Sequence, residues 1–288
     1  MPNQGGPDDR VRRLYAGVVN SVGLYGAPVW ADEAVATRHI KDVLKRVQRR
    51  VAIRVVRGYR TVAHAAASVL VGLPPMDLVA RAHKRAYERI KELRGLETVI
   101  TDRVRGIVRL QARQQMIVEW GEALNHIFST RSEDRVVGAI RLVIEEWMDR
   151  PRGSRMSFHM TQVFSGHGCF GEYLCRIGRE RTIQCNHCED DRDTAQHTLE
   201  HCPAWEEKRR VLMEKIGNDL SLSGIVQKML ESEENWKAMV SFYDRVMLQK
   251  ETTERERERK RDAAMGSGGE PRRKRGRRPP RHLVVDDD

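Results

Sequence analysis

No stretch of this 288-residue sequence is apolar for long enough to cross a lipid bilayer. The longest apolar stretch, residues 65–73, is far shorter than the roughly 20 residues that a membrane-spanning helix needs. The N-terminal residues MPNQGGPDDR contain no apolar segment of the kind found in a secretory signal. We therefore predict an intracellular protein that has no membrane partner.

Aromatic residues and cysteines are also scarce. Aromatics make up 6% of the residues and charged side chains 32%, a balance typical of long solvated helices rather than a β-sandwich. The five cysteines are an odd number, and all of them lie between Cys169 and Cys202. Because intracellular thiols stay reduced, this clustering favours a metal site over disulfides.

Acidic residues are outnumbered by basic ones. The 52 lysines and arginines against 41 aspartates and glutamates give a formal net charge of +11. Such an excess attracts polyanions, of which nucleic acid is the usual one and an anionic membrane surface the alternative. We find no nucleophile–base arrangement, and the acidic run at residues 286–288 ends a basic tail with no scaffold to fix its geometry. We therefore predict no catalytic residues.

One helix, expected at residues 38–57, carries a basic face. Ile40, Val43, Leu44, Val47, Val51 and Val55 recur at helical spacing and form its apolar stripe. Eight cations lie opposite this stripe, against Asp42 alone. This excess of positive charge is more one-sided than solubility requires, and it predicts contact with nucleic acid. The alternative is that the face is only a solvated surface. The eight cations are Arg38, Lys41, Lys45, Arg46, Arg49, Arg50, Arg54 and Arg57.

The cysteines follow a metal-binding pattern, Cys185-x2-Cys188-x8-His197-x4-Cys202. Two residues between thiolates allow a tight turn to aim both sulfurs at one ion. Three cysteines and one histidine complete a tetrahedron, so we predict a closed, structural Zn²⁺ site. His201 is the alternative fourth ligand. Asp193 is positioned to cap a short helix that presents His197.

The overall pattern predicts a mainly α protein in four parts. Residues 1–150 form a string of amphipathic helices, and residues 154–216 form a small Cys3His zinc-knuckle module with a flanking helix. C-terminal helices follow at residues 217–250, and the charged residues 251–288 are expected to be a disordered basic tail. A Gly-x-Gly-x-x-Gly match at residues 166–171 lacks the strand and long helix of a dinucleotide fold, so we interpret it as a loop that braces the zinc module.

Three stretches of the sequence resemble one family. They are VRRLYAGVVNSVGLYGAPVWADEA at residues 11–34, FSGHGCFGEYLCRIGRE at 164–180 and CNHCEDDRDTAQHTLEHCPAWEEKR at 185–209. Together they resemble the C-terminal end of the Pol-like polyprotein of a non-LTR retrotransposon, in the type-1 clade that inserts into arthropod ribosomal DNA. The resemblance covers most of residues 7–250.

This resemblance implies a parent polyprotein with an endonuclease and a Mg²⁺-dependent RNA-directed DNA polymerase, which copies its RNA onto a nicked chromosomal target. Residues 7–150 then correspond to the thumb and connecting helices, and residues 154–216 to the C-terminal zinc module. Residues 1–250 contain no aromatic-x-Asp-Asp motif to hold the polymerase metals. Whether the chain is itself an enzyme is therefore left open, and we interpret it as a fragment without the palm or the endonuclease.

The resulting functional expectation is a C-terminal fragment that binds nucleic acid during target-primed reverse transcription. Its expected partners are RNA and DNA, namely the element transcript and the target chromosomal DNA, and the upstream polymerase domain. Trp205, Phe170 and Tyr173 are candidates either for stacking on bases or for packing the knuckle. The tail PRRKRGRRPPR suits nuclear import, so a nuclear location is expected. The alternative is an autonomous zinc-stabilised helical adaptor or regulatory protein.

Overall fold

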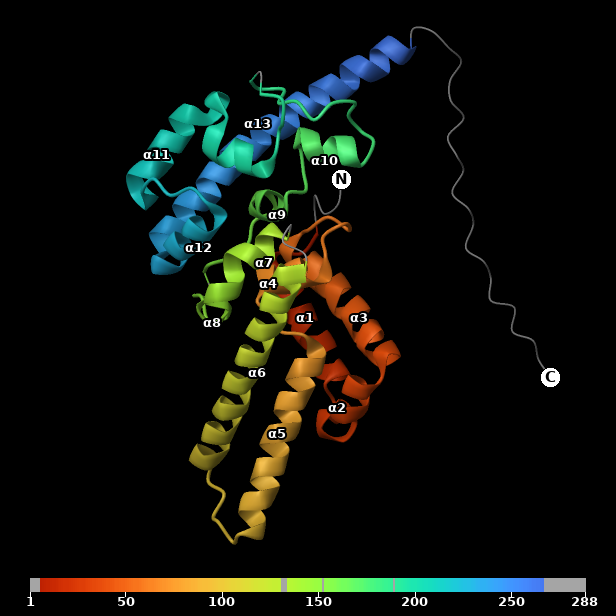
Figure 1. Ribbon diagram of the computed structural model, residues 1–288, viewed down its shortest axis with the longest axis vertical. Coiled ribbons are helices and arrows are strands. Elements are labelled where there is room, and N and C mark those ends of the chain that lie inside the picture. Colours follow the sequence, from red (N-terminus) through yellow and green to blue (C-terminus); the bar gives the residue numbers. More distant parts are fainter. Residues whose placement is uncertain (1–5, 131–133, 152, 189, 267–288) are drawn as a thin grey trace, which may run out of the picture. The chain divides into compact units, whose positions relative to one another are not determined.

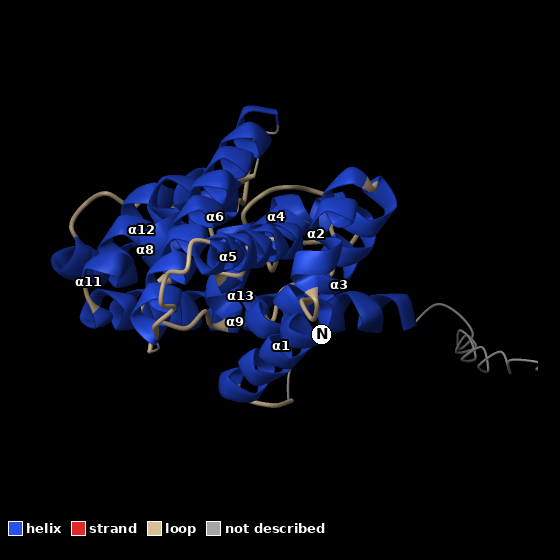
Figure 2. Ribbon diagram, turned by 90° about the horizontal axis from the view of Figure 1, so that it is seen from below, coloured by secondary structure: helices blue, strands red, loops and turns tan. Residues whose placement is uncertain are grey.

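The computed structural model describes residues 6–130, 134–151, 153–188 and 190–266. Within these ranges every regular element is a helix, which confirms the mainly α fold class (Figures 1 and 2). Residues 1–248 form one compact unit and residues 249–288 a second. A hydrophobic core in the first unit draws its residues from Ala16 through to Met247. The finer division at residues 150, 154 and 217 stays a prediction.

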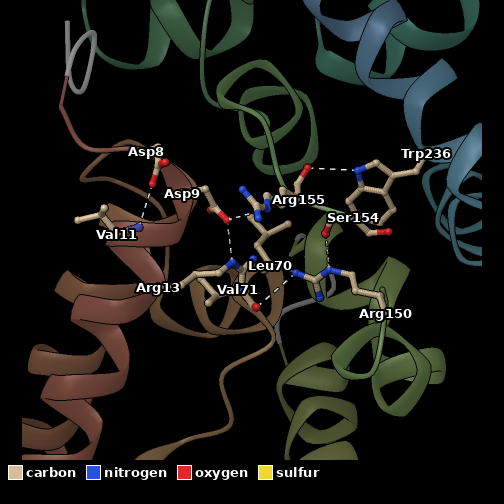
Figure 3. Close-up of polar contacts among 10 residues, drawn as sticks. All are labelled: Asp8, Asp9, Val11, Arg13, Leu70, Val71, Arg150, Ser154, Arg155 and Trp236. Atoms are coloured by element: carbon tan, nitrogen blue, oxygen red, sulfur yellow. Dashed lines mark hydrogen bonds and ion pairs between the residues drawn. The ribbon is translucent and has the colours of Figure 1, made fainter. Parts of the chain in front are cut away.

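The N-terminal helices follow the predicted periodicity closely. They are α1 (Asp9–Gly23), α2 (Ala27–Ala36), α3 (Arg38–Val56), α4 (His64–Val71), α5 (Met76–Gly95) and α6 (Asp102–Thr130). The Asp8 carboxylate caps α1 by accepting from the Val11 amide (Figure 3). Helix α2 begins within the aromatic segment 24–30, where Gly26 at φ 64° and Pro28 start it.

Helices α5 and α6 lie side by side as a long hairpin (Figure 1). Helix α6 contains two glycines, Gly106 and Gly121, and runs through both. Within the described residues, nothing lies within 4 Å of a Cβ placed at either glycine, so their small size serves no close contact there. No single described helix is long and apolar enough to cross a membrane; α4 and α5, bent by 57° at their break, reach that length and composition only as a pair.

Shorter helices follow the hairpin: α7 (Arg135–Ile140), η1 (Arg141–Val143), α8 (Ile144–Met148), α9 (Phe158–Ser165) and α10 (Gly171–Arg176). Asp134 caps α7, with its carboxylate accepting from the Val137 amide at 3.2 Å. Helix α9 has a clear start and end. The Ser157 hydroxyl starts it by accepting from the Met160 amide at 3.1 Å, and Gly166 at φ 68° ends it.

The C-terminal elements are η2 (His197–His201), η3 (Pro203–Trp205), α11 (Glu206–Ile216), α12 (Leu222–Glu231) and α13 (Glu233–Gly266). Helix α13 includes residues 251–266, so the prediction of disorder from residue 251 is wrong for these residues. Alternating charges pair along the helix there, Arg255 with Glu251 at 3.1 Å and Arg257 with Glu254 at 3.2 Å. Residues 267–288 of the predicted tail lie outside the described residues.

Arg150 follows α8 and is half-buried, with its guanidinium directed at backbone carbonyls (Figure 3). Its Nε donates to the Ser154 carbonyl at 3.2 Å, and Nη2 donates to the carbonyls of Leu70 and Val71 at 3.0 and 3.3 Å. Nη1 donates to the Trp147 carbonyl, and the guanidinium lies 4.5 Å from the centre of the Trp147 ring. Burial lowers the pKa of Arg150 to about 9, which leaves the side chain charged at neutral pH.

The segment after Arg150 also joins the N-terminal helix to α13 (Figure 3). Asp9 accepts ion pairs from Arg13 at 3.0 Å and from Arg155 at 3.4 Å. The Trp236 indole of α13 donates to the Arg155 carbonyl at 3.2 Å. Arg150 and Arg155 therefore connect α1, α4, α8 and α13 through backbone carbonyls and one carboxylate.

Candidate metal centre and basic surfaces

The structure brings together Cys185, Cys188, His197 and Cys202. One ligand atom from each residue lies within 4.8 Å of all the others. The sulfurs of Cys185 and Cys202 are 3.9 Å apart, and the Cys188 sulfur is 3.3 Å from His197 Nε2. Four ligands around zinc at bond lengths of 2.0 to 2.3 Å stand about 3.5 to 3.8 Å from one another, so these spacings suit a tetrahedral ion. The cluster could hold one metal ion.

Among the two candidate histidines, the structure selects His197. Its ring is buried, and Nδ1 lies 3.5 Å from the Asp190 carboxylate, which leaves Nε2 directed at the thiols. A carboxylate at the second ring nitrogen fixes the orientation of a metal-binding histidine. His201 instead has an exposed side chain that pairs with Glu200 at 3.2 Å.

The thiols lie close enough to affect one another's ionisation. The neighbouring Cys185 thiol and then burial raise the pKa of Cys202. Burial raises the pKa of Cys188 as its leading cause. Several thiolates in such a site therefore need a cation beside them, and three sulfurs with one imidazole form a donor set that Zn²⁺ accepts. With all four positions filled by side chains, such a site is closed to substrate.

Buried polar contacts hold the ligand-bearing backbone in place. Arg209 donates from Nε to the Leu199 carbonyl at 2.9 Å and from Nη2 to the Cys202 carbonyl at 2.7 Å. The cap of the His197 turn is the Thr194 hydroxyl, which accepts from the His197 amide at 2.9 Å. Asp193, predicted as that cap, is buried and accepts from the Gly171 amide at 2.9 Å.

The glycine-rich loop at residues 166–171 braces this module, as the sequence predicts. A Cβ on Gly171 would lie 2.7 and 2.8 Å from the carbonyl oxygens of Gln184 and Ile183. These carbonyls directly precede the ligand Cys185. The loop therefore packs backbone against backbone, and its last glycine is required by this close approach.

We expect Gly171→Ala to destabilise the protein by about 2 kcal/mol, because the new methyl displaces the residues 183–184 that lead into Cys185. The matched control is Gly178→Ala, since Gly178 lies just beyond α10 and a Cβ there meets nothing within 4 Å; its φ of 72° alone costs about 1 kcal/mol, which the steric effect at Gly171 must exceed. Urea unfolding of both variants in the presence of zinc measures the difference. Equal unfolding midpoints for the two variants would contradict the close packing at Gly171.

The three aromatic residues that were candidates either for base stacking or for packing the knuckle are buried. Phe170 is 1% exposed, Trp205 3% and Tyr173 5%. Tyr173 lies in edge contact with Tyr59 and its hydroxyl is 3.1 Å from that of Thr61. All three side chains therefore pack the core, and base stacking on them is excluded in this conformation.

The predicted basic face of α3 divides into exposed and engaged cations. Arg38, Lys45, Arg46, Arg50 and Arg54 are exposed, while Lys41, Arg49 and Arg57 are half-buried.

Arg49 and Arg57 have structural positions. Arg49 donates from Nε to the Val62 carbonyl at 2.9 Å and from Nη2 to the Arg60 carbonyl, so it holds the loop after α3. Arg57 terminates α3 with a left-handed backbone at φ 56°. The apolar stripe is likewise divided: Val51 and Val55 are buried, whereas Val43 and Val47 are exposed.

Sequence reasoning missed a second group of cations, on α5 and α6. Lys91 and Arg94 on α5, together with Arg105 and Arg109 on α6, line one cavity. Each helix contributes only two of the four, so neither helix alone has the one-sided pattern that identified α3. The spacing of three or four residues within each pair is the only signal in the sequence.

Two curated proteins are similar to most of this chain. Over 239 residues, 80% of the chain, it is 26% identical to the retrovirus-related Pol polyprotein from type-1 retrotransposable element R1 4 of Nasonia vitripennis. Over 252 residues, 83% of the chain, it is 28% identical to a 115 kDa protein in type-1 retrotransposable element R1DM of Drosophila melanogaster. Both similar proteins are encoded by type-1 retrotransposable elements.

The chain spans 57% of the length of the Nasonia protein and 23% of the Drosophila protein. The similarity to these two proteins over 80% and 83% of the chain confirms the predicted resemblance to a type-1 retrotransposon Pol polyprotein. No family model matches the sequence. No solved structure matches it either.

Proposed function

We propose that this chain is a nucleic-acid-binding, C-terminal part of a type-1 retrotransposon Pol polyprotein. Its similarity to two retrotransposon-encoded proteins supports the polyprotein, and its net charge of +11 supports the polyanionic partner. The proposed partners are the element transcript, the target chromosomal DNA and the polymerase domain of the same polyprotein, in the nucleus. Polymerase and endonuclease chemistry, with the Mg²⁺ it needs, is proposed for other parts of that polyprotein.

A structural Zn²⁺ ion is part of this proposal. Cys185, Cys188, His197 and Cys202 are its proposed ligands, because their donor atoms lie within 4.8 Å of one another and the set matches the chemistry of structural zinc sites. Bound zinc would cross-link a polar segment that has few apolar side chains to fix its shape. The ion thereby supports the packing of α10 and α11 rather than a reaction.

The exposed cations of α3 carry the nucleic-acid part of the proposal. Lys45, Arg46 and Arg50 lie within two turns of one helix, and all three are exposed. Phosphate contacts of this kind hold a backbone without reading its sequence. Arg49, engaged with loop carbonyls, is assigned to the support of this face rather than to contact.

We expect the triple variant Lys45→Gln, Arg46→Gln, Arg50→Gln to weaken nucleic-acid binding by about tenfold at low salt and to flatten its salt dependence. Each phosphate that is no longer neutralised lowers the slope of log K against log salt by roughly 0.7 to 0.9, so three of them lower it by about 2 to 3. Fluorescence anisotropy of the full-length, zinc-loaded chain with RNA and with RNA–DNA hybrid measures both quantities.

The matched control carries Lys228→Gln, Lys237→Gln and Arg245→Gln, which remove the same charge from α12 and α13. Glutamine keeps helix propensity close to that of lysine and arginine. The basic tail is present in every variant, so its own affinity for polyanions cancels in the comparison. If the slope falls equally in both triple variants, the face of α3 is only a solvated surface.

A helical adaptor is the second candidate function, and one observation favours it. Helix α1 exposes a row of apolar side chains at helical spacing, with Leu14 69%, Val18 54% and Val22 73% exposed. An apolar helical face of this kind suits a protein partner. Absence of binding to RNA, DNA and hybrid by the wild-type chain would favour this candidate over the first.

A further inference from the structure

A basic groove lies between α5 and α6, away from the zinc cluster and from α3. Its cavity is about 350 Å³, and its lining is Tyr87, Ile90, Lys91, Arg94, Arg105 and Arg109. We call these six residues the hairpin groove. Four of its side chains are cations, and none of those that line it is acidic. The Tyr87 side chain is 56% exposed.

The helical geometry explains why these residues meet. On α5, Tyr87, Lys91 and Arg94 are separated by four and then three residues, which places them on one face. On α6, Arg105 and Arg109 are four residues apart and share a face in the same way. Since α5 packs against α6 (Figure 1), the two faces bring four positive charges to one groove.

The other cations of α5 are paired with acids. Arg81 and Arg85 both bind the Glu119 carboxylate, at 3.2 and 2.7 Å. Lys84 pairs with Asp32, and with Glu88 at 3.5 Å. Arg89 pairs with Glu92 at 3.0 Å.

The cations of the hairpin groove form fewer ion pairs with acidic residues. Arg105 pairs with the highly exposed Asp102 at 3.3 Å. For Lys91, Arg94 and Arg109, the described part of the chain shows no ion pair. Their mutual repulsion is therefore left for solvent ions or a ligand to compensate. That contrast along one helix indicates an anionic partner rather than a solubilising surface.

We infer that the hairpin groove binds single-stranded nucleic acid, with the phosphodiester backbone against the four cations and a base against the Tyr87 ring. A basic groove that tracks a backbone beside an exposed aromatic ring is the recognised combination for single strands, because every base has a face on which a ring stacks. The inference rests on the proposed function. It adds a second region that contacts nucleic acid, on α5 and α6, to the one proposed on α3.

The test uses the full-length, zinc-loaded chain and a fluorescein-labelled, unstructured RNA of 20 nucleotides. Lys91→Gln with Arg109→Gln is expected to lower the salt slope by about 1.4, two contacts at roughly 0.7 each for a single strand. The matched control, Arg89→Gln with Arg103→Gln, removes the same charge from exposed positions of the same two helices outside the groove. It should leave the slope unchanged to within a few tenths.

Tyr87 supplies a readout that charge does not affect. Tyr87→Ala should weaken binding to the single strand about fivefold or more, while Tyr87→Phe keeps the ring and should bind as the wild type does. Binding to duplex DNA, whose bases are already stacked, should be unaffected by Tyr87→Ala. Equal loss on single strand and duplex would show that the ring only supports the helix.

The outcomes separate this inference from the proposed function. If the α3 triple variant loses affinity while the groove variant matches its control, the inference is overturned and the proposed function stands. If the wild-type chain binds no nucleic acid, both are overturned. If polyglutamate of equal charge displaces the RNA as well as polyuridylate does, the groove is an acidic-peptide site, and the inference is again overturned.

Discussion

Replacing Cys185 and Cys202 together with serine is expected to abolish metal binding and to unfold the segment around residues 183–202. Both side chains are buried, so each serine places a hydroxyl where the proposed ion needs a thiolate. Apparent binding free energies of structural zinc are on the order of 10 to 16 kcal/mol in small zinc-finger peptides, and folding of the bound segment depends on them. We therefore expect zinc to fall from one ion per chain to none.

Elemental analysis of the purified chain measures the loss, and limited proteolysis locates the unfolded segment. Cys175→Ser is the matched control, because Cys175 lies outside the cluster and should keep a full zinc content. His197→Asn should lose the metal and His201→Asn should retain it, since only His197 faces the thiols. One zinc per chain in the doubly substituted protein would falsify the ligand assignment.

The same site predicts how zinc affinity responds to acid. Bound thiolates and a neutral imidazole must take up protons when the metal leaves, so protons compete with zinc at low pH. Affinity should therefore fall steadily as the pH is lowered from neutral. A fluorescent zinc indicator, titrated at several pH values, follows the release. An affinity independent of pH would exclude cysteine thiolates as ligands.

The metal cluster was accessible to sequence reasoning because its ligands are close in the chain. Cys185 and Cys188 share a turn, and the remaining ligands follow within 14 residues of Cys188. The choice between His197 and His201 was not accessible, since it depends on which ring turns inward and on the Asp190 carboxylate that holds it. Asp193 was misassigned for a related reason, because its partner Gly171 is 22 residues away.

For the basic surfaces, too, contacts between residues distant in the chain could not be predicted from the sequence. Periodicity correctly predicted helix α3, but the role of Arg49 depends on carbonyls 11 and 13 residues further along the chain. The hairpin groove requires knowing that α5 packs on α6, which no pattern within either helix states. The predicted disorder at residues 251–266 failed because composition alone was considered, whereas charges of opposite sign at spacings of three and four residues stabilise a helix.

Substitution of Arg150 is expected to have the largest effect on stability outside the metal site. Arg150→Met removes the donors for four backbone carbonyls, those of Leu70, Val71, Trp147 and Ser154. A buried acceptor left without a donor costs about 1 to 3 kcal/mol, and the methionine recovers part of this by filling the space beside the Trp147 ring. We expect a net loss of about 3 to 5 kcal/mol in the free energy of unfolding.

Arg150→Lys distinguishes charge from geometry at this position. Lysine keeps the positive charge but lacks the planar group of donors that reaches carbonyls on both α4 and the segment after α8, so about half of the loss should remain. Arg155→Gln is the matched control. In the wild-type chain, Nε of Arg155 pairs with Asp9 at 3.4 Å, and the Arg155 side chain is 36% exposed. Loss of this exposed ion pair should cost less than about 1 kcal/mol. Urea unfolding at saturating zinc compares the variants. Tryptophan fluorescence follows the unfolding, with Trp147 and Trp236 as the nearby reporters.

A methionine variant as stable as the wild type would show that the carbonyls find other donors. In that case the junction of α4, α8 and α13 would be held by the packing of Trp147 against Trp236, whose rings lie 5.6 Å apart, and not by the guanidinium.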